Sequence, residues 1–337
     1  MARYAKTESR EWARETLRGV CDVVIPSYTA DLRGLNERGI RHDVARQQEL
    51  GFLGALLVSE TALTLDEYVR FTEWSVDEAK GNLLLIHHAS FNTLEENIEA
   101  VRRCEAAGAE LVLLTYPPSF RPRSENDIYD YTAAFCNSTN LAVMLFPLPY
   151  WGFEGIHPSS LSVDLVERLV HDCSNVAVVK AEGGAPSVGG FAYMWDRFSD
   201  RLVVTMPIEQ DAIPLATLVP MQLIATSNTE YYGAEVPQQL ALVHEGKISE
   251  AMERYWRMYP ARKANESGAP IPAANMVNRA AWKYQAWLAG FNGGPLRMPS
   301  TRLNPSQMAT FRRGLENSGL DVTSDPDELY FEGRFPA

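Results

Sequence analysis

The sequence predicts an α/β fold, a (β/α)8 TIM barrel with a C-terminal helical appendage. The main observation is a cadence that begins near residue 20, in which a short apolar run, a turn and an amphipathic stretch of about a dozen residues recur eight times. A second observation is length, because 337 residues suffice for one large barrel and an appendage. A doubly wound open sheet is the alternative, but IPSYTADLRG is not its glycine-rich phosphate loop.

The predicted strands are short and rich in branched apolar residues. In chain order they are CDVVIP (Cys21 to Pro26), GALLV (Gly54 to Val58), LLLIH (Leu83 to His87), LVLLT (Leu111 to Thr115), AVMLF (Ala142 to Phe146), VAVVK (Val176 to Lys180), LVVTM (Leu202 to Met206) and QLIAT (Gln222 to Thr226). The third unit shows why helices are expected between them. Thr93 and Glu96 form a capping-box pattern, and Gly108 suits the left-handed cap that ends a helix.

The rhythm changes after the eighth run. Residues 1–18 are predicted to be an N-terminal segment, 19–233 the barrel, and 234–337 the last barrel helix, a C-terminal helical region and a tail. The predicted C-terminal helices are Ala234 to Glu245, Ile248 to Lys263, Met276 to Ala289 and Ser306 to Ser318, with NESGAPIPAA as one of the loops. The last stretch, TSDPDELYFEGRFPA, is interpreted as a poorly structured tail or a strap over a neighbouring subunit.

Composition and charge exclude several classes of function. The net charge is -12, and no cluster of lysines and arginines outweighs it locally, so nucleic-acid and acidic-membrane partners are not expected. The N-terminus has no apolar core like that of a secretion signal, and no run has the length of a membrane span. Four cysteines without a CxxC pair fit reduced thiols, which predicts a cytoplasmic protein.

One strand ends on an amine, in SNVAVVKAEGG. The catalytic groups of such a barrel come from the C-terminal ends of its strands, and Lys180 ends the sixth. A lysine at an apolar mouth loses its proton more easily and becomes a nucleophile toward carbonyls. The alternative is a lysine that merely marks the strand edge, or one that Glu182 keeps protonated.

Four segments carry a resemblance to a known family. They are VVIPSYTADLRGLNERGI, HHASFNTLEENIEAVRRCEAAGAELVLLTYPPSFRP, VAVVKAEGG and SNTEYYGAEVPQQLALVHEGKISEAME. Their order resembles the dihydrodipicolinate synthase and N-acetylneuraminate lyase superfamily, class I aldolases and dehydratases that attach 2-oxo acids to a strand-six lysine. The resemblance runs from about Gly19 to Met258. The long helical C-terminus is similar to that of the hydratase-aldolase branch, which cleaves aromatic benzylidenepyruvates.

The resemblance implies a function for Lys180. The lysine would form a Schiff base with a 2-oxo acid such as pyruvate, an electron sink for making or breaking a carbon–carbon bond. Neither a metal nor an organic cofactor is implied. The partners implied are the 2-oxo acid, an aldehyde, and further copies of the chain in a dimer or tetramer.

Two departures from the family pattern affect the site. The family places a proton-relaying tyrosine in a YNxP-like pattern after strand five, whereas this chain reads FPLP, with Phe146 in the tyrosine's place. The GTTGE-like loop that holds the substrate carboxylate is replaced by LLVSE, which leaves Ser59 and Glu60. Loss of a general acid-base group costs about a hundred- to ten-thousand-fold in rate when nothing replaces it.

Replacements for the missing tyrosine are sought among residues at nearby strand ends. Tyr116 follows strand four, Tyr150 lies in the strand-five loop, and His87 and His88 end strand three. Adjacent residues on a strand point to opposite faces, so only one histidine should face the mouth. The predicted catalytic residues are Lys180, Tyr116 and Tyr150, and the predicted substrate-binding residues are Ser59, Glu60, His87, Phe146, Trp151, Glu182 and Asn228.

The strand-five loop LFPLPYWGF supplies four aromatic residues. Phe146, Tyr150, Trp151 and Phe153 would line an apolar, flat-sided pocket that suits an aromatic substrate half. Alternatively, they pack the loop against the barrel or another subunit. The loop lacks the arginine of the diaminopimelate-pathway enzymes, which argues against lysine biosynthesis.

Three hypotheses follow. The first is a Schiff-base lyase, in its specific form a hydratase-aldolase acting on an aryl-substituted 2-oxo acid. The second, which Phe146 and LLVSE favour, is a barrel that binds a 2-oxo acid without turnover. The third is a metal-dependent aldolase, although no spacing resembles a metal motif such as HExxH. Its ligands would come from Glu60, His87, His88, Glu182, Glu209 and Asp211.

Overall fold

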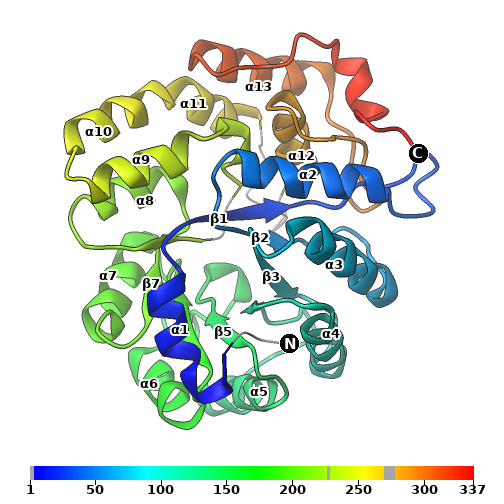
Figure 1. Ribbon diagram of the computed structural model, residues 1–337. Coiled ribbons are helices and arrows are strands. Elements are labelled where there is room, and N and C mark those ends of the chain that lie inside the picture. The colour runs from blue at the N-terminus through cyan, green and yellow to red at the C-terminus, as the bar shows by residue number, and fades with distance from the viewer. Residues whose placement is uncertain (1–3, 226–227, 269–277) are drawn as a thin grey trace.

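The predicted barrel is confirmed. A computed structural model describes residues 4–225, 228–268 and 278–337. Its parallel strands follow one another in space in the order β7-β6-β5-β4-β3-β2-β1-β8 (Figure 1). They are β1 (Gly19–Val24), β2 (Gly54–Leu57), β3 (Leu84–Ala89), β4 (Leu111–Leu114), β5 (Ala142–Leu145), β6 (Val176–Lys180), β7 (Val203–Thr205) and β8 (Leu223–Ile224).

A threonine side chain links the two strands at the ends of this order. The Thr205 hydroxyl donates a hydrogen bond to the Leu223 carbonyl (2.8 Å) and accepts one from the Ala225 N–H (3.0 Å). Among the described residues, no backbone ladder pairs β7 with β8 as it pairs the other neighbouring strands. The Thr205 side chain joins these two strands instead.

Helices follow the strands as predicted. They are α2 (Glu37–Glu49), α3 (Leu65–Ala79), α4 (Leu94–Ala107), α5 (Glu125–Asn137), α6 (Val163–Asp172), α7 (Ser187–Phe198), α8 (Glu209–Ala216) and α9 (Glu235–His244). Helix α4 ends at Gly108 in the left-handed conformation, and the Thr93 side chain accepts from the Glu96 N–H. The Glu96 carboxylate reaches the Asn92 N–H instead of Thr93, so only half of the expected capping box forms.

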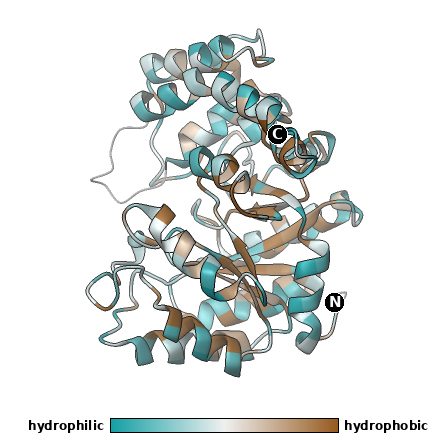
Figure 2. Ribbon diagram, turned by 90° about the vertical axis from the view of Figure 1, so that its left-hand side faces the viewer, coloured by the Kyte–Doolittle hydropathy of each residue, from teal (hydrophilic) through white to brown (hydrophobic). Residues whose placement is uncertain are grey.

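The apolar residues divide into two layers, one inside the barrel and one between the strands and the helices. In Figure 2 the strands are brown, while much of the outer surface of the helices is teal. The N-terminal segment belongs to the inner layer, because Ala13 and Leu17 of α1 (Ser9–Thr16) and its C-cap pack there. Arg10 fixes this helix to the barrel by donating to the Val176 and Cys173 carbonyls (both 2.9 Å).

The C-terminal region is helical, with one correction. Its helices are α10 (Ile248–Arg257), α11 (Tyr259–Gly268), α12 (Arg279–Leu288) and α13 (Pro305–Asn317). The predicted single helix from Ile248 to Lys263 is wrong, because the helix breaks at Met258 and a new one begins at Tyr259. Pro260 has no N–H to donate to the preceding turn, and its ring clashes with that turn's carbonyl.

The start of the predicted Met276 to Ala289 helix, most of the NESGAPIPAA loop and Thr226 at the end of the eighth predicted strand lie outside the described residues.

The tail is not poorly structured, because it packs on its own chain. Its 3-10 helix, Asp327–Phe331, buries Tyr330. Arg334 donates to the carbonyls of Trp287 (2.9 Å) and Phe291 (3.0 Å), so the tail packs on the chain's own α12 region. The sequence predicted neither contact, because both partners lie about forty residues away.

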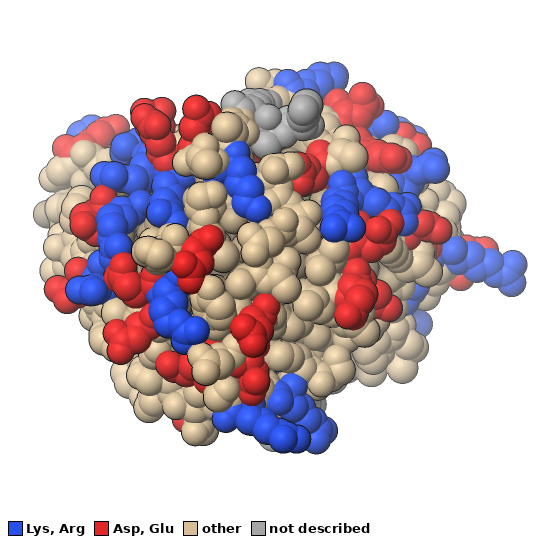
Figure 3. Space-filling model, turned by 90° about the horizontal axis from the view of Figure 1, so that it is seen from below, with Lys and Arg blue, Asp and Glu red and all other residues tan. Residues whose placement is uncertain are grey.

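The surface shows no single dominant charge on the face drawn in Figure 3, where acidic and basic side chains intermingle. All four cysteines are buried free thiols. Within the described ranges, no helix has both the length and the apolar character needed to cross a bilayer.

Candidate active site

Lys180 lies in the mouth of the barrel, at the C-terminal end of β6. Val178 faces the interior and Val179 the helices, so the alternation of the strand returns Lys180 to the inside. Its Nζ lies 3.5 Å from the Glu182 Oε1 and 3.8 Å from the centroid of the Phe146 ring. The residue is only 5% exposed.

Burial changes the protonation of both members of this pair. It lowers the pKa of Lys180, and the neighbouring Glu182 carboxylate raises it again in part. Burial also raises the pKa of Glu182, while Lys180 lowers it. The two pKa values therefore move toward one another. The neutral pair, an amine beside a carboxylic acid, thus lies closer in free energy to the ion pair than it would in water.

A second charged group lies at the mouth around Glu60. This carboxylate pairs with Arg279 and accepts a hydrogen bond from the Ser90 hydroxyl (2.8 Å). Burial raises the pKa of Glu60, but Arg279 and His88 outweigh burial and bring it to about 2. Glu60 is therefore ionised and held in place.

Arg279 at the mouth was not predicted from the sequence. It is the first residue of α12, far from the barrel in sequence and beyond the segments that carry the family resemblance. Its guanidinium stacks 4.5 Å from the Trp282 ring, and the residue is 8% exposed. No local pattern marks it, because its role depends on where the C-terminal region packs.

Of the adjacent histidines, His88 faces the mouth. Its Nδ1 lies 3.3 Å from the Ser59 hydroxyl oxygen, and its Nε2 lies 3.8 Å from Glu60. Burial is the main reason that the pKa of His88 falls to about 4, so the imidazole is neutral near pH 7. The predicted Ser59 and Glu60 thus meet at this histidine.

His87, the histidine predicted for substrate binding, points the other way. Its ring lies 5.4 Å from that of Tyr68 in the layer between strands and helices, and neither ring nitrogen has a hydrogen-bond partner among the described residues. Burial lowers its pKa to about 3. The structure therefore brings His88, and not His87, toward Lys180.

Tyr116 also points away from the mouth. It continues the outward alternation of Val112 and Leu114 on β4. Its hydroxyl lies 2.7 Å from the Thr132 hydroxyl of α5, and burial raises its pKa. The structure does not bring this tyrosine to Lys180.

The aromatic residues of the strand-five loop have separate positions. Phe146 lies against Lys180, and Trp151 packs edge-on against Phe146 and donates its indole N–H to the Phe146 carbonyl (2.6 Å). Tyr150 is 64% exposed, whereas Phe153 is buried against Tyr116. Phe146 and Trp151 therefore border the site, and Phe153 anchors the loop. Asn228, after β8, is partly exposed.

The metal hypothesis requires a cluster of ligands. In the described part of the chain, no three His, Cys, Asp or Glu side chains are arranged to hold an ion. Two of the candidates, Glu60 and Glu209, instead pair with Arg279 and Arg262.

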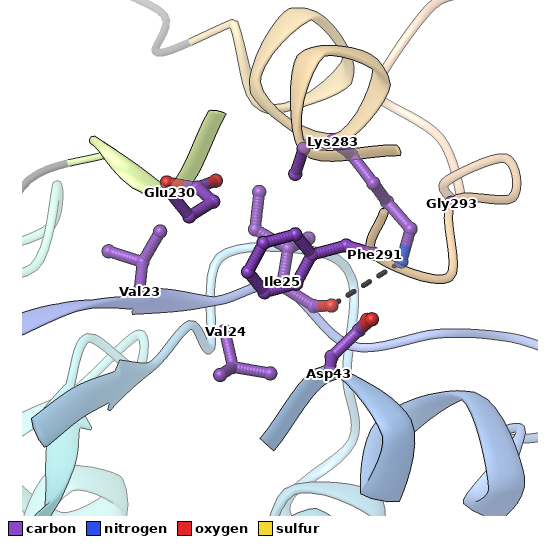
Figure 4. A pocket seen from close by; sticks show the side chains of 9 residues that line it. Val23, Val24, Ile25, Asp43, Glu230, Lys283, Phe291 and Gly293 are labelled. Carbon is purple, nitrogen blue, oxygen red and sulfur yellow. Dashed lines mark hydrogen bonds between the residues drawn. The ribbon is translucent and has the colours of Figure 1, made fainter. Parts of the chain in front are cut away.

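A different ionisable cluster lies on the outer side of β1, around a small cavity (Figure 4). Lys283 of α12 donates to the carbonyls of Ile25 and Pro26, and burial lowers its pKa to about 8. Figure 4 shows Asp43 of α2 near the end of Lys283, and Glu230 on the other side of the cavity. Asp22 of β1 accepts from the Thr229 N–H (3.0 Å). These groups join the barrel to α12.

Burial is the main reason that the pKa of Asp22 rises to about 7. Burial and the nearby Asp22 raise the pKa of Glu230 well above its usual value.

Comparison with known proteins supports the assignment of the fold. Residues 59–315 match the family described as the dihydrodipicolinate synthetase family. The chain is 24% identical over 316 residues to a 4-hydroxy-tetrahydrodipicolinate synthase of Methanopyrus kandleri, covering 90% of this chain and 97% of that one. It is 26% identical over 252 residues to an uncharacterized DapA-like lyase of Pyrobaculum arsenaticum, covering 72% and 79%.

Solved structures show the same fold at lower identity. DHDPS from Cyanidioschyzon merolae with lysine bound has a TM-score of 0.77 at 20% identity, with 90% of this chain and 99% of that chain covered. N-acetylneuraminate lyase from Fusobacterium nucleatum has a TM-score of 0.72 at 17% identity, with 89% and 98% covered.

Proposed function

Because the chain belongs to the dihydrodipicolinate synthetase family, a family of class I Schiff-base lyases, we propose that Lys180 is the amine that binds a 2-oxo acid. One observation carries the proposal. The Lys180 amine is buried at the C-terminal end of β6, and burial lowers its pKa. A buried amine with a lowered pKa is a stronger nucleophile at neutral pH than an exposed one.

The proposed chemistry uses the imine as an electron sink. The Lys180 amine adds to the C2 carbonyl, and water leaves. The C4 hydroxyl then loses its proton and becomes the aldehyde carbonyl, while the protonated imine accepts the electron pair of the breaking C3–C4 bond. The reverse sequence forms that bond with an aldehyde. All of these steps take place at the strand ends, where barrel enzymes hold their catalytic groups.

For the substrate, we propose an aryl-substituted 2-oxo acid that is hydrated and cleaved. Phe146 and Trp151 support this proposal, because their rings border the amine and offer flat apolar surface to an aromatic group. Several relatives are named 4-hydroxy-tetrahydrodipicolinate synthase, but the strand-five loop from 146 to 153 contains no arginine here. That composition favours an apolar substrate half.

The test is borohydride trapping. The protein is incubated with pyruvate, reduced, digested and mapped by mass spectrometry, with Lys180→Ala in parallel. We expect an adduct on the peptide that contains Lys180 and none in the variant. If neither pyruvate nor a small panel of other 2-oxo acids gives an adduct, the Schiff-base proposal is wrong.

The aryl proposal has its own test. With a trapped imine established, the rates with benzaldehyde and with a short aliphatic aldehyde are compared. We expect benzaldehyde to be preferred, and Trp151→Ala to reduce that preference. Equal rates for both aldehydes would contradict the aryl assignment while leaving the imine intact.

A second candidate is a barrel that binds a 2-oxo acid without turnover. The observation that favours it is the packing of Phe146, which has no acid-base group, against Lys180. An adduct on Lys180 without carbon–carbon bond formation or cleavage across an aldehyde panel would support it.

A further inference from the structure

We infer that Glu182 is the proton carrier of this site and does the work that a tyrosine does elsewhere in the family. The inference rests on the proposed imine at Lys180. It assigns to Glu182 proton transfer at the substrate oxygen, at the lysine nitrogen and at C3.

The backbone places Glu182 beside the amine. It follows Lys180 by two positions, so both side chains point to the same side. Its Oε1 lies 3.5 Å from the Lys180 Nζ. The C3 atom of an imine is two bonds from that nitrogen, and hence within reach of a carboxylate at this distance.

The segment that carries Glu182 is held on both sides. The Glu182 N–H donates to the Pro147 carbonyl (3.2 Å), which ties it to the strand-five loop. The next residue, Gly183, packs so closely on Ser159 that a Cβ would lie 2.2 Å from the Ser159 carbonyl oxygen. The carboxylate is therefore positioned by the backbone, as a group acting at fixed distance must be.

The other acid-base groups of the mouth have different partners. Glu60 pairs with Arg279 and accepts from Ser90. The Nδ1 of His88 lies against Ser59. Both groups also act on Lys180 through their charge or proximity, but the ion pair with the Lys180 nitrogen, at 3.5 Å, is made by Glu182.

Burial supports the same assignment. It raises the pKa of Glu182 and lowers that of Lys180, so a proton passes between them at a smaller free-energy difference than in water. The Phe146 ring packs over the amine, and Lys180 is only 5% exposed.

Glu182 takes part in four proton transfers as the imine and then the enamine form. The lone pair of the neutral amine attacks C2, the carbonyl π pair moves to oxygen, and Glu182 protonates that oxygen. The nitrogen returns a proton to Glu182, which then protonates the hydroxyl group. Water leaves as the nitrogen lone pair forms the protonated imine. Finally the Glu182 carboxylate takes a proton from C3, the C–H pair forms the C2–C3 double bond, and the imine π pair moves to nitrogen.

The test separates imine formation from proton transfer at carbon. Wild type, Glu182→Gln and the control Glu154→Gln, an exposed loop carboxylate, are incubated with pyruvate in D2O. NMR follows hydrogen–deuterium exchange of the pyruvate methyl group, and borohydride traps the imine after long incubation. We expect Glu182→Gln to give the Lys180 adduct but to exchange at least about 100-fold more slowly than wild type. Glu154→Gln should exchange like wild type.

Each of the remaining outcomes would overturn the role of Glu182. Exchange in Glu182→Gln within a few-fold of wild type overturns the role of Glu182, and so does a wild-type adduct without exchange. A folded Glu182→Gln that forms no adduct even after long incubation also overturns it, because the loss of a proton carrier slows imine formation without abolishing it. If wild type forms no adduct with pyruvate or with the panel of other 2-oxo acids, the proposed function fails and the role of Glu182 fails with it.

Discussion

Two neighbours of Lys180 act on its proton in the same direction and against burial. The Glu182 carboxylate favours the ammonium form, and so does the face of the Phe146 ring, because the ring quadrupole attracts cations. Burial favours the neutral amine and is the largest influence on its pKa. Phe146 therefore has a second effect besides replacing a proton-relaying tyrosine.

We predict that Phe146→Leu lowers the pKa of Lys180 further. A cation–π contact is worth about 0.5–1 kcal/mol at an exposed site and about 2 kcal/mol at a desolvated one, so its loss corresponds to between roughly half and one and a half pKa units. Because the neutral amine is the nucleophile, the pH of half-maximal imine formation should move down by that amount. The measurement is the initial rate of borohydride-trapped pyruvate adduct between pH 6 and 10.

The control is Phe153→Leu, which alters the same loop without touching Lys180. It should leave the pH midpoint unchanged. A midpoint that rises in Phe146→Leu would show that the ring acts mainly by excluding water.

At the scale of elements, two glycines let α7 approach the segment that follows the catalytic lysine. A Cβ on Gly190 would lie 1.7 Å from the Gly183 carbonyl oxygen. A Cβ on Gly183 would meet the Ser159 carbonyl in turn. Gly183 and Gly190 thus allow close backbone packing after Lys180, and this packing fixes the direction of the Glu182 side chain.

We predict opposite effects for alanine at two adjacent positions of α7. Gly190→Ala should destabilise the protein by about 1–3 kcal/mol, because the methyl group collides with backbone. Gly189→Ala meets no atom within 4 Å, so it should be neutral or stabilise by up to about 1 kcal/mol through helix propensity.

Urea unfolding measures both free energies, and trapping with pyruvate follows the site. Gly190→Ala should also slow adduct formation, because Gly183 and Glu182 must shift. Equal stabilities for the two variants would contradict the packing argument.

Helix α12 connects the active site to the cluster outside β1. Arg279 and Lys283 are four residues apart and thus on one face of the helix. Arg279 pairs with Glu60 at the mouth, while Lys283 binds the chain after β1. The C-terminal region is therefore part of the site.

At the scale of the whole molecule, buried carboxyl groups couple stability to pH. The pKa of Asp22 rises to about 7 and that of Glu230 lies well above its usual value, mainly through burial. The folded protein retains protons that the unfolded chain has released. Their contribution is complete below the unfolded pKa near 4 and is lost as pH rises through the folded values.

We predict that Glu230→Gln becomes progressively more stable relative to wild type from pH 5 to pH 8. The glutamine side chain is neutral in both the folded and the unfolded variant. In wild type the unfolded chain releases the Glu230 proton while the folded protein retains it, so the free energy of unfolding falls as pH rises. The advantage should grow by up to about 1.4 kcal/mol per pH unit. Titrating groups other than the neighbouring Asp22 cancel in the comparison, which is made by urea unfolding at each pH.

Glu328→Gln, at an exposed position of the tail, is the matched control, because it makes the same substitution outside the buried cluster. A pH-independent difference for Glu230→Gln would mean that Glu230 is ionised in the folded protein.

The sequence by itself determined the barrel, the placement of its helices and the position of Lys180 at the end of β6. These follow from local signals, since each apolar run, cap and glycine acts within a few residues. It did not determine which side of a strand faces inward. Strands of a parallel barrel are buried on both faces, so Leu85 and Ile86 are alike in pattern, and the sequence could not choose between His87 and His88.

Only the tertiary structure decided the rest of the site. It turned Tyr116 toward α5 and brought Arg279 to Glu60. The physical reason is that these contacts depend on how distant segments pack, and packing is a property of the complete core. The sequence shows which chemical groups the chain contains, but only the folded structure shows which group each of them contacts.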